Sequence, residues 1–484
     1  ANGFCKNIIT VINKAATALK LTLKDVKIDV SDTGKNTGYP WTSDEGKAAL
    51  SVQGNGNVEI ELDGNNELKS GPHRAGLEKN TSTSTGTLTL KDDNNEAGSL
   101  TATGGDWGAG IGNGGYYGNS DNRSGENITI TGGTVNATGG WGGAGIGGGY
   151  YGSGKNITIK GGTVTATGGE EGAGIGGGYY YGGGYYGNGE NIKITDGTVN
   201  ATGGWGGAGI GGGGGGGNGA GGNGKNITII GGTVTAGGGY RGAGIGGGIS
   251  GSGKNITITG GTVNADGGTN AAGIGGGATG SGSNVTVSGA AQVTAIAGKS
   301  NGYYGAGATI GNGGDFTGSE NVDGKEIQAD ISRVTTGYIH HIIYDPALVS
   351  EDNPLGIVRE WWEPERPQPK PENPQPNPED PNAPAEESNE VDLGTPLLHV
   401  ETLEGDPLPF NAQQQGSTLR VTSDNLAARL HGTRQALEAL QEQGVEQIQF
   451  VTTLKTTTLP VAELLAEGGS WFALEHNGLV SRRL

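Results

Sequence analysis

The chain has 484 residues, of which 105 are glycine and 17 are proline, and its formal net charge is −19 at pH 7. This acidic balance argues against nucleic acid and anionic membrane surfaces as partners, and no apolar run is long enough to span a bilayer. A glycine and proline content near a quarter of the chain is typical of disorder unless those residues recur with a fixed period.

The N-terminal residues bear on the compartment of the protein. The chain starts at Ala1 and contains no methionine, which indicates a processed N-terminus, most simply through removal of a signal peptide. We therefore expect a secreted or cell-surface protein. Cys5 is the one cysteine and cannot form a disulfide within the chain, so it is either a free or an intermolecular thiol.

Residues 1–98 are predicted to form irregular opening coils of β-structure. Apolar and polar residues alternate in Leu21–Val30 and again in Val58–Leu62, and turn-forming residues follow these runs. Residues 6–19 fit either a capping helix or the first coil of the β-helix. The second alternative, in which this segment forms a strand, is preferred.

From residue 99 to 288 the chain repeats a glycine-rich unit. One copy reads Asn-Ile-Thr-Ile-Thr-Gly-Gly-Thr-Val-Asn-Ala-Thr-Gly-Gly, then Trp-Gly-Gly-Ala-Gly-Ile-Gly-Gly-Gly, then a variable piece. The opening asparagines are spaced by 29, 35, 35, 29 and 29 residues, and the longer steps differ only in the variable piece. Insertions confined to one place of a repeat map to one loop on one side of a stack. The opening residues are Asn127, Asn156, Asn191, Asn226, Asn255 and Asn284.

Within one copy the apolar residues alternate with polar ones in three short segments. Their inward pairs are Ile128 and Ile130, Val135 and Ala137, and Ala144 and Ile146. Period-two spacing predicts extended segments, whereas glycine costs roughly 1 kcal/mol at each helical position. Three segments with Gly-Gly corners fit one three-sided coil, and stacked coils bury a continuous column. The predicted fold is mainly β, a right-handed parallel β-helix whose hand follows from the preference of parallel crossovers.

The copies degrade after the last full repeat. Residues 289–345 are expected to be closing coils that end in a strand at Tyr338–Tyr344, so that the β-helix covers residues 1–345. Residues 346–390 are predicted to be an acidic linker. Nine prolines lie between Pro364 and Pro384, and such composition prefers extended polyproline geometry.

Residues 391–484 are predicted to be a small α/β module, because glycine becomes scarce and the hydrophobic content ordinary. One helix is expected from an N-cap at Ser423 to a stop at Gly444, and a shorter one at Val461–Ala466. The apolar stripe of the first helix is Leu426, Leu430, Leu437 and Leu440. The expected strands are Leu397–Thr402, Thr418–Thr422, Ile448–Val451 and Trp471–Glu475.

The repeated Gly-Ala-Gly-Ile-Gly-Gly-Gly, together with Asn-Ile-Thr-Ile and Gly-Gly-Thr-Val, resembles repeats of carbohydrate-binding right-handed parallel β-helix proteins from the surfaces of Gram-positive anaerobes. The strand at Leu21–Val30 and the segment that begins at Glu59 are similar to the opening coils of that group. The resemblance covers about residues 20–320 and does not extend to residues 391–484. It implies an extracellular, non-catalytic, glycan-associated protein in which calcium could assist. It implies no individual binding residue.

Aromatic residues recur at one position of the repeat and in the variable piece. Stacked coils would align the first set along one edge, where flat rings can stack on sugar rings. Three interpretations stay open, namely glycan contact, subunit contact, and intramolecular cover of the glycine corners. The candidates after the second Gly-Gly are Trp107, Trp141, Trp205 and Tyr240, with Glu170 in the intervening copy. The variable pieces carry Tyr116-Tyr117, Tyr150-Tyr151, Tyr179-Tyr180 and Tyr185-Tyr186.

Two sets of polar residues could serve either as ligands or as structural elements. The six opening asparagines are predicted to be a structural ladder of stacked amides. Acidic residues near the corners could hold calcium, which prefers several oxygen ligands, but their spacing gives no ligand pattern. These residues are Asp106, Glu170, Glu171, Asp196 and Asp266. We therefore predict no cofactor and no metal site.

Three classes of function remain at this point. A glycan-binding adhesin is preferred, with polysaccharide or glycan as partner. A filament subunit is the alternative, because a solenoid exposes unpaired strand edges at its ends and head-to-tail contacts give open filaments. A polysaccharide lyase is the third, and we expect no enzyme, because the repeats lack a basic cluster and Arg241 is the one arginine between Gly125 and Lys325.

Overall fold

The computed structural model describes residues 3–34, 45–94, 96–115, 124–181, 187–216, 221–317, 319–345, 348, 356–364, 398–402, 407–408, 410–423, 425, 427–453, 455–466, 471–477 and 480–483. The chain forms two compact units, Ala1–Arg366 and Pro367–Leu484.

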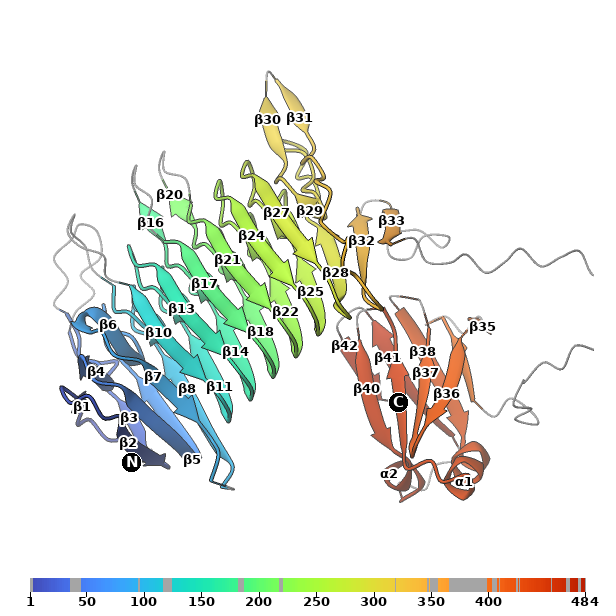
Figure 1. The fold of residues 1–484 in the computed structure, drawn as a ribbon, viewed down its shortest axis with the longest axis horizontal. Coiled ribbons are helices and arrows are strands. Elements are labelled where there is room, and N and C mark those ends of the chain that lie inside the picture. The colour runs from blue at the N-terminus through green and yellow to red at the C-terminus, as the bar shows by residue number, and fades with distance from the viewer. Residues whose placement is uncertain are drawn as a thin grey trace, which may run out of the picture. The chain divides into compact units, whose positions relative to one another are not determined.

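Each regular coil of the first unit has three short strands, one on each of three sides (Figure 1). In the coil that begins at Gly125, side 1 is β10 (Gly125–Ile130), side 2 is β11 (Thr134–Thr138) and side 3 is β12 (Ile146–Gly147). All six predicted inward residues of this coil are buried. The mainly β class and the parallel β-helix are therefore confirmed.

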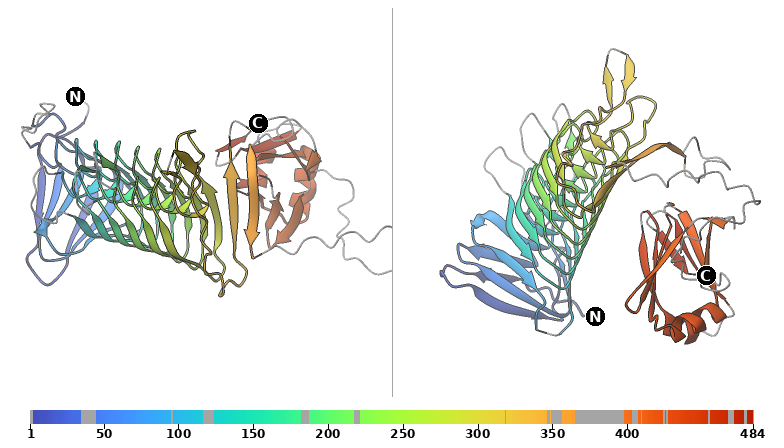
Figure 2. Two further views of the ribbon diagram at one scale, coloured as in Figure 1. Left: turned by 90° about the horizontal axis from the view of Figure 1, so that it is seen from above. Right: turned by 45° about the vertical axis from the view of Figure 1, so that its right-hand side comes forward.

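Equivalent strands of successive coils pair in parallel and in register, so each side is a continuous ladder (Figure 2). On side 1, Ile130 lies beside Ile159, and Ile159 lies beside Ile194. Like apolar residues therefore stack along the interior. Side 1 comprises β2 (Leu19–Lys24), the first half of β5 (Val58–Lys69), β7 (Leu88–Lys91), β10, β13 (Gly154–Ile159), β17 (Gly189–Ile194), β21 (Gly224–Ile229), β24 (Gly253–Ile258) and β27 (Gly282–Val287).

Sides 2 and 3 repeat this arrangement. Side 2 comprises β3 (Lys27–Asp29), the second half of β5, β8 (Gly98–Thr103), β11, β14 (Thr163–Thr167), β18 (Thr198–Thr202), β22 (Thr233–Gly237), β25 (Thr262–Asp266), β28 (Gln292–Ala297) and β32 (Tyr338–Tyr344). Side 3 comprises β1 (Ile9–Ile12), β4 (Leu50–Gly54), β6 (Leu77–Ser84), β9 (Ile111–Gly112), β12, β15 (Ile175–Gly176), β19 (Ile210–Gly211), β23 (Ile245–Gly246), β26 (Ile274–Gly275) and β29 (Ile310–Gly311). The strand preferred for residues 6–19 is thus confirmed as β1.

The glycine of each short side-3 strand is required by its backbone. Gly147 has φ +131° and Gly176 has φ +139°, a region that residues with a side chain rarely adopt. A Cβ on Gly147 would also collide with the carbonyl oxygen of Gly176 on the next coil. Glycine thus lets the coils stack while their backbone turns sharply after two residues.

The two ends of the β-helix differ. At the N-terminal end, β1 pairs with β4 alone within the described residues, and its last residue, Ile12, is 56% exposed. At the other end β33 (Ile357–Glu363) pairs with β32 in antiparallel fashion. The predicted linker therefore started too early, because residues 357–363 complete the β-helix. Residues 346–347, 349–355 and 365–390 of that predicted linker lie outside the described part of the chain.

Two small strand pairs extend the variable loops. β16 (Tyr180–Tyr181) pairs in parallel with β20 (Gly215–Gly216), and β30 (Asp315–Thr317) forms an antiparallel hairpin with β31 (Glu320–Val322). This hairpin projects from the edge of the β-helix that also carries the variable loops (Figures 1 and 2). The insertions of the sequence repeat thus gather on one edge, as their confinement to one place predicted.

The second unit contains two sheets and two short helices. One sheet has the antiparallel order β35-β34-β38-β41-β42, and the other has the order β36-β37-β39-β40, of which only β37 and β39 are parallel. The elements are β34 (Leu398–Glu401), β35 (Pro407–Leu408), β36 (Asn411–Gln415), β37 (Thr418–Thr422), β38 (Ala427–Thr433), α1 (Arg434–Glu442), β39 (Gln447–Val451), β40 (Thr456–Pro460), α2 (Val461–Ala466), β41 (Trp471–Asn477) and β42 (Val480–Arg483).

The first predicted helix of this unit begins too early. Leu430 lies in β38, where alternate residues are buried, and α1 starts only at Arg434. The N-cap is Thr433, whose Oγ1 accepts a hydrogen bond of 3.2 Å from the backbone N–H of Ala436. The stop at Gly444, with φ +79°, and the second helix are confirmed. The sequence predicted an α/β module with comparable helix and strand content, whereas the observed unit consists mainly of antiparallel sheet.

Candidate functional site

Two kinds of turn meet at one edge of the β-helix because side 3 is only two residues long. The turn from side 2 to side 3 lies next to the variable loop that leads back to side 1. Hydrogen bonds join them across coils: Tyr150 N–H donates to the carbonyl oxygen of Trp107 (2.7 Å), and Tyr179 N–H donates to that of Gly142 (2.7 Å). Side chains from both kinds of turn therefore lie against one another.

Aromatic rings follow this edge and form what we call the aromatic strip. It comprises the predicted Trp107, Trp141, Tyr150, Tyr151, Tyr179, Tyr180, Trp205 and Tyr240, together with Tyr303, Tyr304 and Phe316. Three of its rings offer substantial surface, since Trp141 is 39%, Trp205 45% and Tyr240 40% exposed. These three occupy the same position of their repeats, so the strip presents flat apolar rings at intervals of one or two coils.

The first block of the strip is a cluster of contacting rings. Trp107 stacks on Tyr150 with centroids 5.0 Å apart, and Trp141 meets Tyr179 edge to face at 5.3 Å. Tyr151 contacts the ring of Tyr180 at 4.9 Å. Tyr150, Tyr179 and Tyr180 were proposed as contact residues for a ligand or a subunit, but all three are at least nine-tenths buried. They pack beneath the exposed rings and support them. Tyr116, Tyr117, Tyr185 and Tyr186 lie outside the described residues.

The second block joins Trp205 and Tyr240 to rings that sequence analysis missed. Trp205 and Tyr240 stack with centroids 5.5 Å apart. The guanidinium carbon of Arg241 lies 4.6 Å from the centroid of Tyr304, whose neighbour Tyr303 stacks on Phe316 at 4.5 Å. The repeat has degraded at residues 299–316, so no alignment of copies points to these rings. The only signal in the sequence is Gly298, which occupies the position of Gly239 and indicates that the residues after it lie at the same edge.

A pair of carboxyl groups separates the two blocks. Glu170 is exposed at the position of the tryptophans, whereas the Glu171 side chain turns inward over Gly206 and Gly214. Its Oε2 atom is buried without a hydrogen-bond partner in the described structure. Burial, and to a smaller extent the Glu170 carboxylate, raise the pKa of Glu171 to about 7. A hydrogen bond from the backbone N–H of Gly206 stabilises the anion and acts in the opposite direction. This acidic gap can therefore change its charge near neutral pH.

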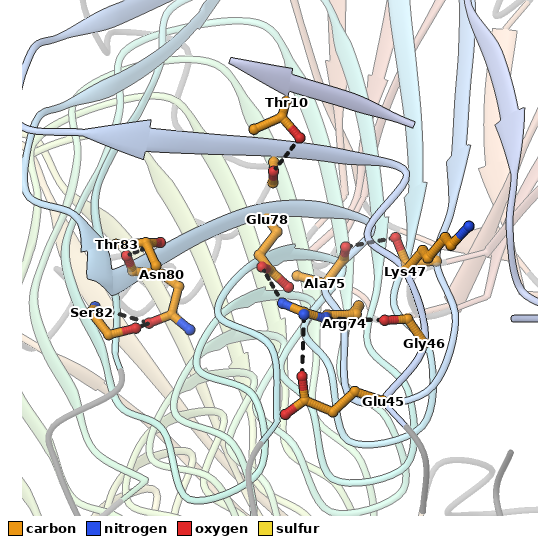
Figure 3. A network of polar contacts seen from close by, with 12 residues as sticks. Thr10, Glu45, Gly46, Lys47, Arg74, Ala75, Glu78, Asn80, Ser82 and Thr83 are labelled. Carbon is orange, nitrogen blue, oxygen red and sulfur yellow. Dashed lines mark hydrogen bonds and ion pairs between the residues drawn. The ribbon is translucent and has the colours of Figure 1, made fainter. Parts of the chain in front are cut away.

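The N-terminal end of the strip carries a charged network that sequence analysis did not anticipate (Figure 3). His73 meets Trp107 edge to face at 4.3 Å. The next residue, Arg74, forms ion pairs with Glu78 (2.9 Å) and Glu45 (3.2 Å) and donates to the carbonyl of Gly46 (3.2 Å). Burial raises the pKa of Glu78, although the positive charge of Arg74 partly offsets this rise. Aligning Ala75-Gly76-Leu77 with Ala109-Gly110-Ile111 would have placed His73 in the column of Trp107.

The opening asparagines of the six repeats form an unbroken amide ladder on side 1. From Asn156 onward, each Nδ2 donates to the Oδ1 of the asparagine on the preceding coil, at distances of 3.0 to 3.1 Å. All six have positive φ, between 53° and 57°. Asparagine is among the few residues that tolerate this conformation, so one residue type meets both the backbone and the hydrogen-bonding demand. The members are Asn127, Asn156, Asn191, Asn226, Asn255 and Asn284.

The acidic residues considered for calcium do not come together. In the part of the chain that the structure describes, no three side chains of His, Cys, Asp or Glu are placed to bind a metal ion. Asp266, like Glu171, is partly buried rather than solvated. Burial raises its pKa to about 6, and its Oδ1 has no partner among the described residues.

Comparisons with known proteins place the repeats in a class. The β-helix repeat family model matches residues 128–150, 157–179, 192–214, 227–249 and 256–278. The chain is therefore a β-helix repeat protein over residues 128–278, in agreement with the long parallel sheet. Comparisons with curated proteins and with solved structures give no match. None of the helices in the described residues is long and apolar enough to cross a membrane.

Proposed function

We propose that this β-helix is a non-catalytic extracellular adhesin that binds polysaccharide along its aromatic strip. The observation that carries the proposal is the alignment of Trp141, Trp205 and Tyr240, each about two-fifths exposed, on one edge at intervals of two coils and one coil. Coils stack about 4.8 Å apart, a spacing comparable to the size of one sugar ring. Flat rings offer an apolar face to the C–H surface of a sugar, and neighbouring polar groups can bind its hydroxyls.

The strip is supported in a way that suits an extended ligand. Tyr150 and Tyr179 are buried behind Trp107 and Trp141 and hold them by ring contacts. Rigid rings lose little conformational entropy when a ligand binds. A preformed row of rings is therefore better suited to recognition than single exposed aromatic residues on mobile loops.

The proposal is tested by affinity electrophoresis through gels that contain neutral or acidic polysaccharides. Wild-type protein is expected to be retarded by at least one polysaccharide, and the Trp141→Ala/Trp205→Ala variant should migrate as in an empty gel. Ile230→Ala is the matched control, since it removes an apolar side chain that is 43% exposed away from the strip. Equal retardation of all three proteins would overturn the role of the strip.

A filament subunit is the second candidate, favoured by the N-terminal end. The described residues leave β1 with one unpaired edge, and Ile8 and Ile12 are 46% and 56% exposed. Such an edge can template the addition of another chain. Electron microscopy of concentrated protein should then show fibres that Ile12→Lys abolishes. Isolated particles of both proteins would dismiss this candidate.

A polysaccharide lyase is the third candidate and the weakest supported. A lyase needs a basic residue beside carboxylates, and Arg74 with Glu45 and Glu78 is the nearest arrangement on this edge. The guanidinium of Arg74 already forms ion pairs with both carboxylates, so these groups are engaged with one another rather than available to a substrate. Release of unsaturated sugars from pectic substrates would contradict the non-catalytic proposal.

A further inference from the structure

We propose that Arg241 forms a subsite for the acidic group of an anionic sugar, which makes acidic polysaccharides the ligand class of the strip. This inference rests on the proposed function and adds the chemical class of the ligand. Arg241 lies at the second block, one residue after the exposed ring of Tyr240. Its position places a cation directly beside a sugar-stacking surface.

The guanidinium of Arg241 is held by rings rather than by carboxylates. Its central carbon lies 4.6 Å from the centroid of Tyr304 and 5.6 Å from that of Tyr240. Such cation–π contacts fix the plane of an arginine without neutralising its charge. In the described structure its side chain has no ion pair and no hydrogen bond, and its Nε is buried without a partner. Arg74 and Arg429, in contrast, each contact two carboxylates.

The loop that presents Tyr304 is built by its own hydrogen bonds. Asn301 Oδ1 accepts from the N–H groups of Tyr303 and Tyr304 at 2.9 and 2.8 Å, and Ser300 Oγ donates to the carbonyl of Tyr304 at 2.6 Å. Asn301 Nδ2 also donates to the hydroxyl of Tyr240 at 3.3 Å. The rings on either side of Arg241 are thus tied together across coils, so the site is preformed.

The charged residues near the second block differ from those of the acidic gap at Glu170 and Glu171. Glu170 and Glu171 lie two coils before Arg241, and the exposed Lys299 follows it at the position that Tyr240 holds on its coil. The chain as a whole carries 49 acidic and 30 basic residues, so an arginine without a carboxylate partner, followed two coils later by a lysine, is against the general balance. An acidic sugar would be attracted to the second block and repelled from the acidic gap.

The chemistry of recognition follows from the guanidinium. Its planar fork can donate two parallel hydrogen bonds to a carboxylate, which a lysine ammonium cannot reproduce. The sugar ring that carries this carboxylate would stack on Tyr240. The ester of the same acid keeps the ring but loses the charge and one acceptor, so it should bind more weakly.

The test is a titration of the full chain with four acidic probes, namely oligomers of galacturonate, alginate, hyaluronate and sialic acid, and with the methyl ester of the galacturonate oligomer. At least one acidic probe should bind, and Arg241→Gln should weaken it by about tenfold or more, with Arg241→Lys intermediate. Arg333→Gln is the control, because it removes an exposed arginine elsewhere and should change nothing. A methyl ester that binds as well as its acid would contradict the subsite.

The outcomes separate this inference from the proposed function. Binding of neutral glycans alone, or acidic binding that Arg241→Gln leaves intact, overturns the subsite while the adhesin survives. Binding of no glycan at all overturns both. Acidic binding that is lost in Arg241→Gln and kept in Arg333→Gln supports both. A salt titration adds a check, because binding that depends on one charge should weaken as ionic strength rises.

Discussion

The indole of Trp205 stacks on the phenol ring of Tyr240 from the next coil, with centroids 5.5 Å apart and planes 23° apart. The two residues are 35 positions apart in sequence, and they meet because the repeat returns the chain to the same edge. Both rings remain more than one-third exposed. The pair is therefore a surface feature that the interior of the β-helix does not need.

Removing either ring should leave the fold intact. Trp205→Ala and Tyr240→Ala are each expected to lower the free energy of unfolding by no more than about 1.5 kcal/mol, the range of a single aromatic pair. Each should weaken polysaccharide binding much more than it changes stability. Thermal unfolding followed by circular dichroism, next to affinity electrophoresis, measures both. Loss of the folded state in either variant would show that the rings are structural.

The asparagine ladder allows the backbone and hydrogen-bond contributions to be separated at Asn226. Asn226→Ala removes two amide hydrogen bonds and places alanine at φ 54°, so we expect a loss of roughly 2–3 kcal/mol. Asn226→Gly removes the same bonds but tolerates that φ, and should be less damaging by about 1 kcal/mol. Denaturant unfolding would compare the two. Equal losses would mean that the positive φ carries no cost.

Glycine positions should differ sharply in their tolerance of alanine. Gly211→Ala puts a Cβ at φ +141° against the carbonyl oxygen of Gly246, so we expect a loss of more than about 3 kcal/mol or failure to fold. Gly237→Ala is the control, because a Cβ there meets nothing within 4 Å. It should be neutral or slightly stabilising through the unfolded chain. Soluble yield and melting temperature give the readout, and similar behaviour of the two would refute the stacking argument.

The pKa of Glu171 predicts a specific dependence of stability on pH. Its folded pKa of about 7 lies above its ordinary value of 4.5, so the folded state holds the proton more tightly than the unfolded state. The resulting stabilisation is complete below pH 4.5 and is lost as pH rises toward 7. After allowance for solvent screening it amounts to about 1–2 kcal/mol.

Glu171→Gln should flatten this dependence, and Glu170→Gln should shift it to lower pH because one neighbouring charge is removed. Melting temperatures between about pH 5 and about pH 8 would show both effects. The prediction is wrong if Glu171→Gln and wild-type protein lose stability equally over that range.

The sequence predicted the β-helix because its information is local and repeated. Ile128 and Ile130 are matched by isoleucine or valine with the same alternate spacing in every copy, and the same six inward positions are buried coil after coil. The contacts of the strip are not local. Tyr150 stacks on Trp107, which lies 43 residues earlier, and this contact depends on the two-residue length of side 3. The periodicity of the sequence does not predict that the side-3 strand is only two residues long.

The second unit shows the opposite case. Leu430, Leu437 and Leu440 fit a helical stripe, yet Ala428, Leu430 and Gly432 are also alternate residues of a strand. This segment forms a strand because β38 pairs with β34 on one side and with β41 on the other. Short segments that satisfy both periods are settled by tertiary contacts, which the sequence of a single copy does not reveal. In the repeats, by contrast, five matching copies removed that ambiguity.

A glycan array probed with the whole chain tests the central claim most directly. The account predicts that wild-type protein binds at least one polysaccharide family above background, with acidic members preferred, and that Trp141→Ala/Trp205→Ala loses the same signals while Ile230→Ala keeps them. A wild-type protein that binds none of the glycans, or a strip variant that binds them all equally well, would contradict it.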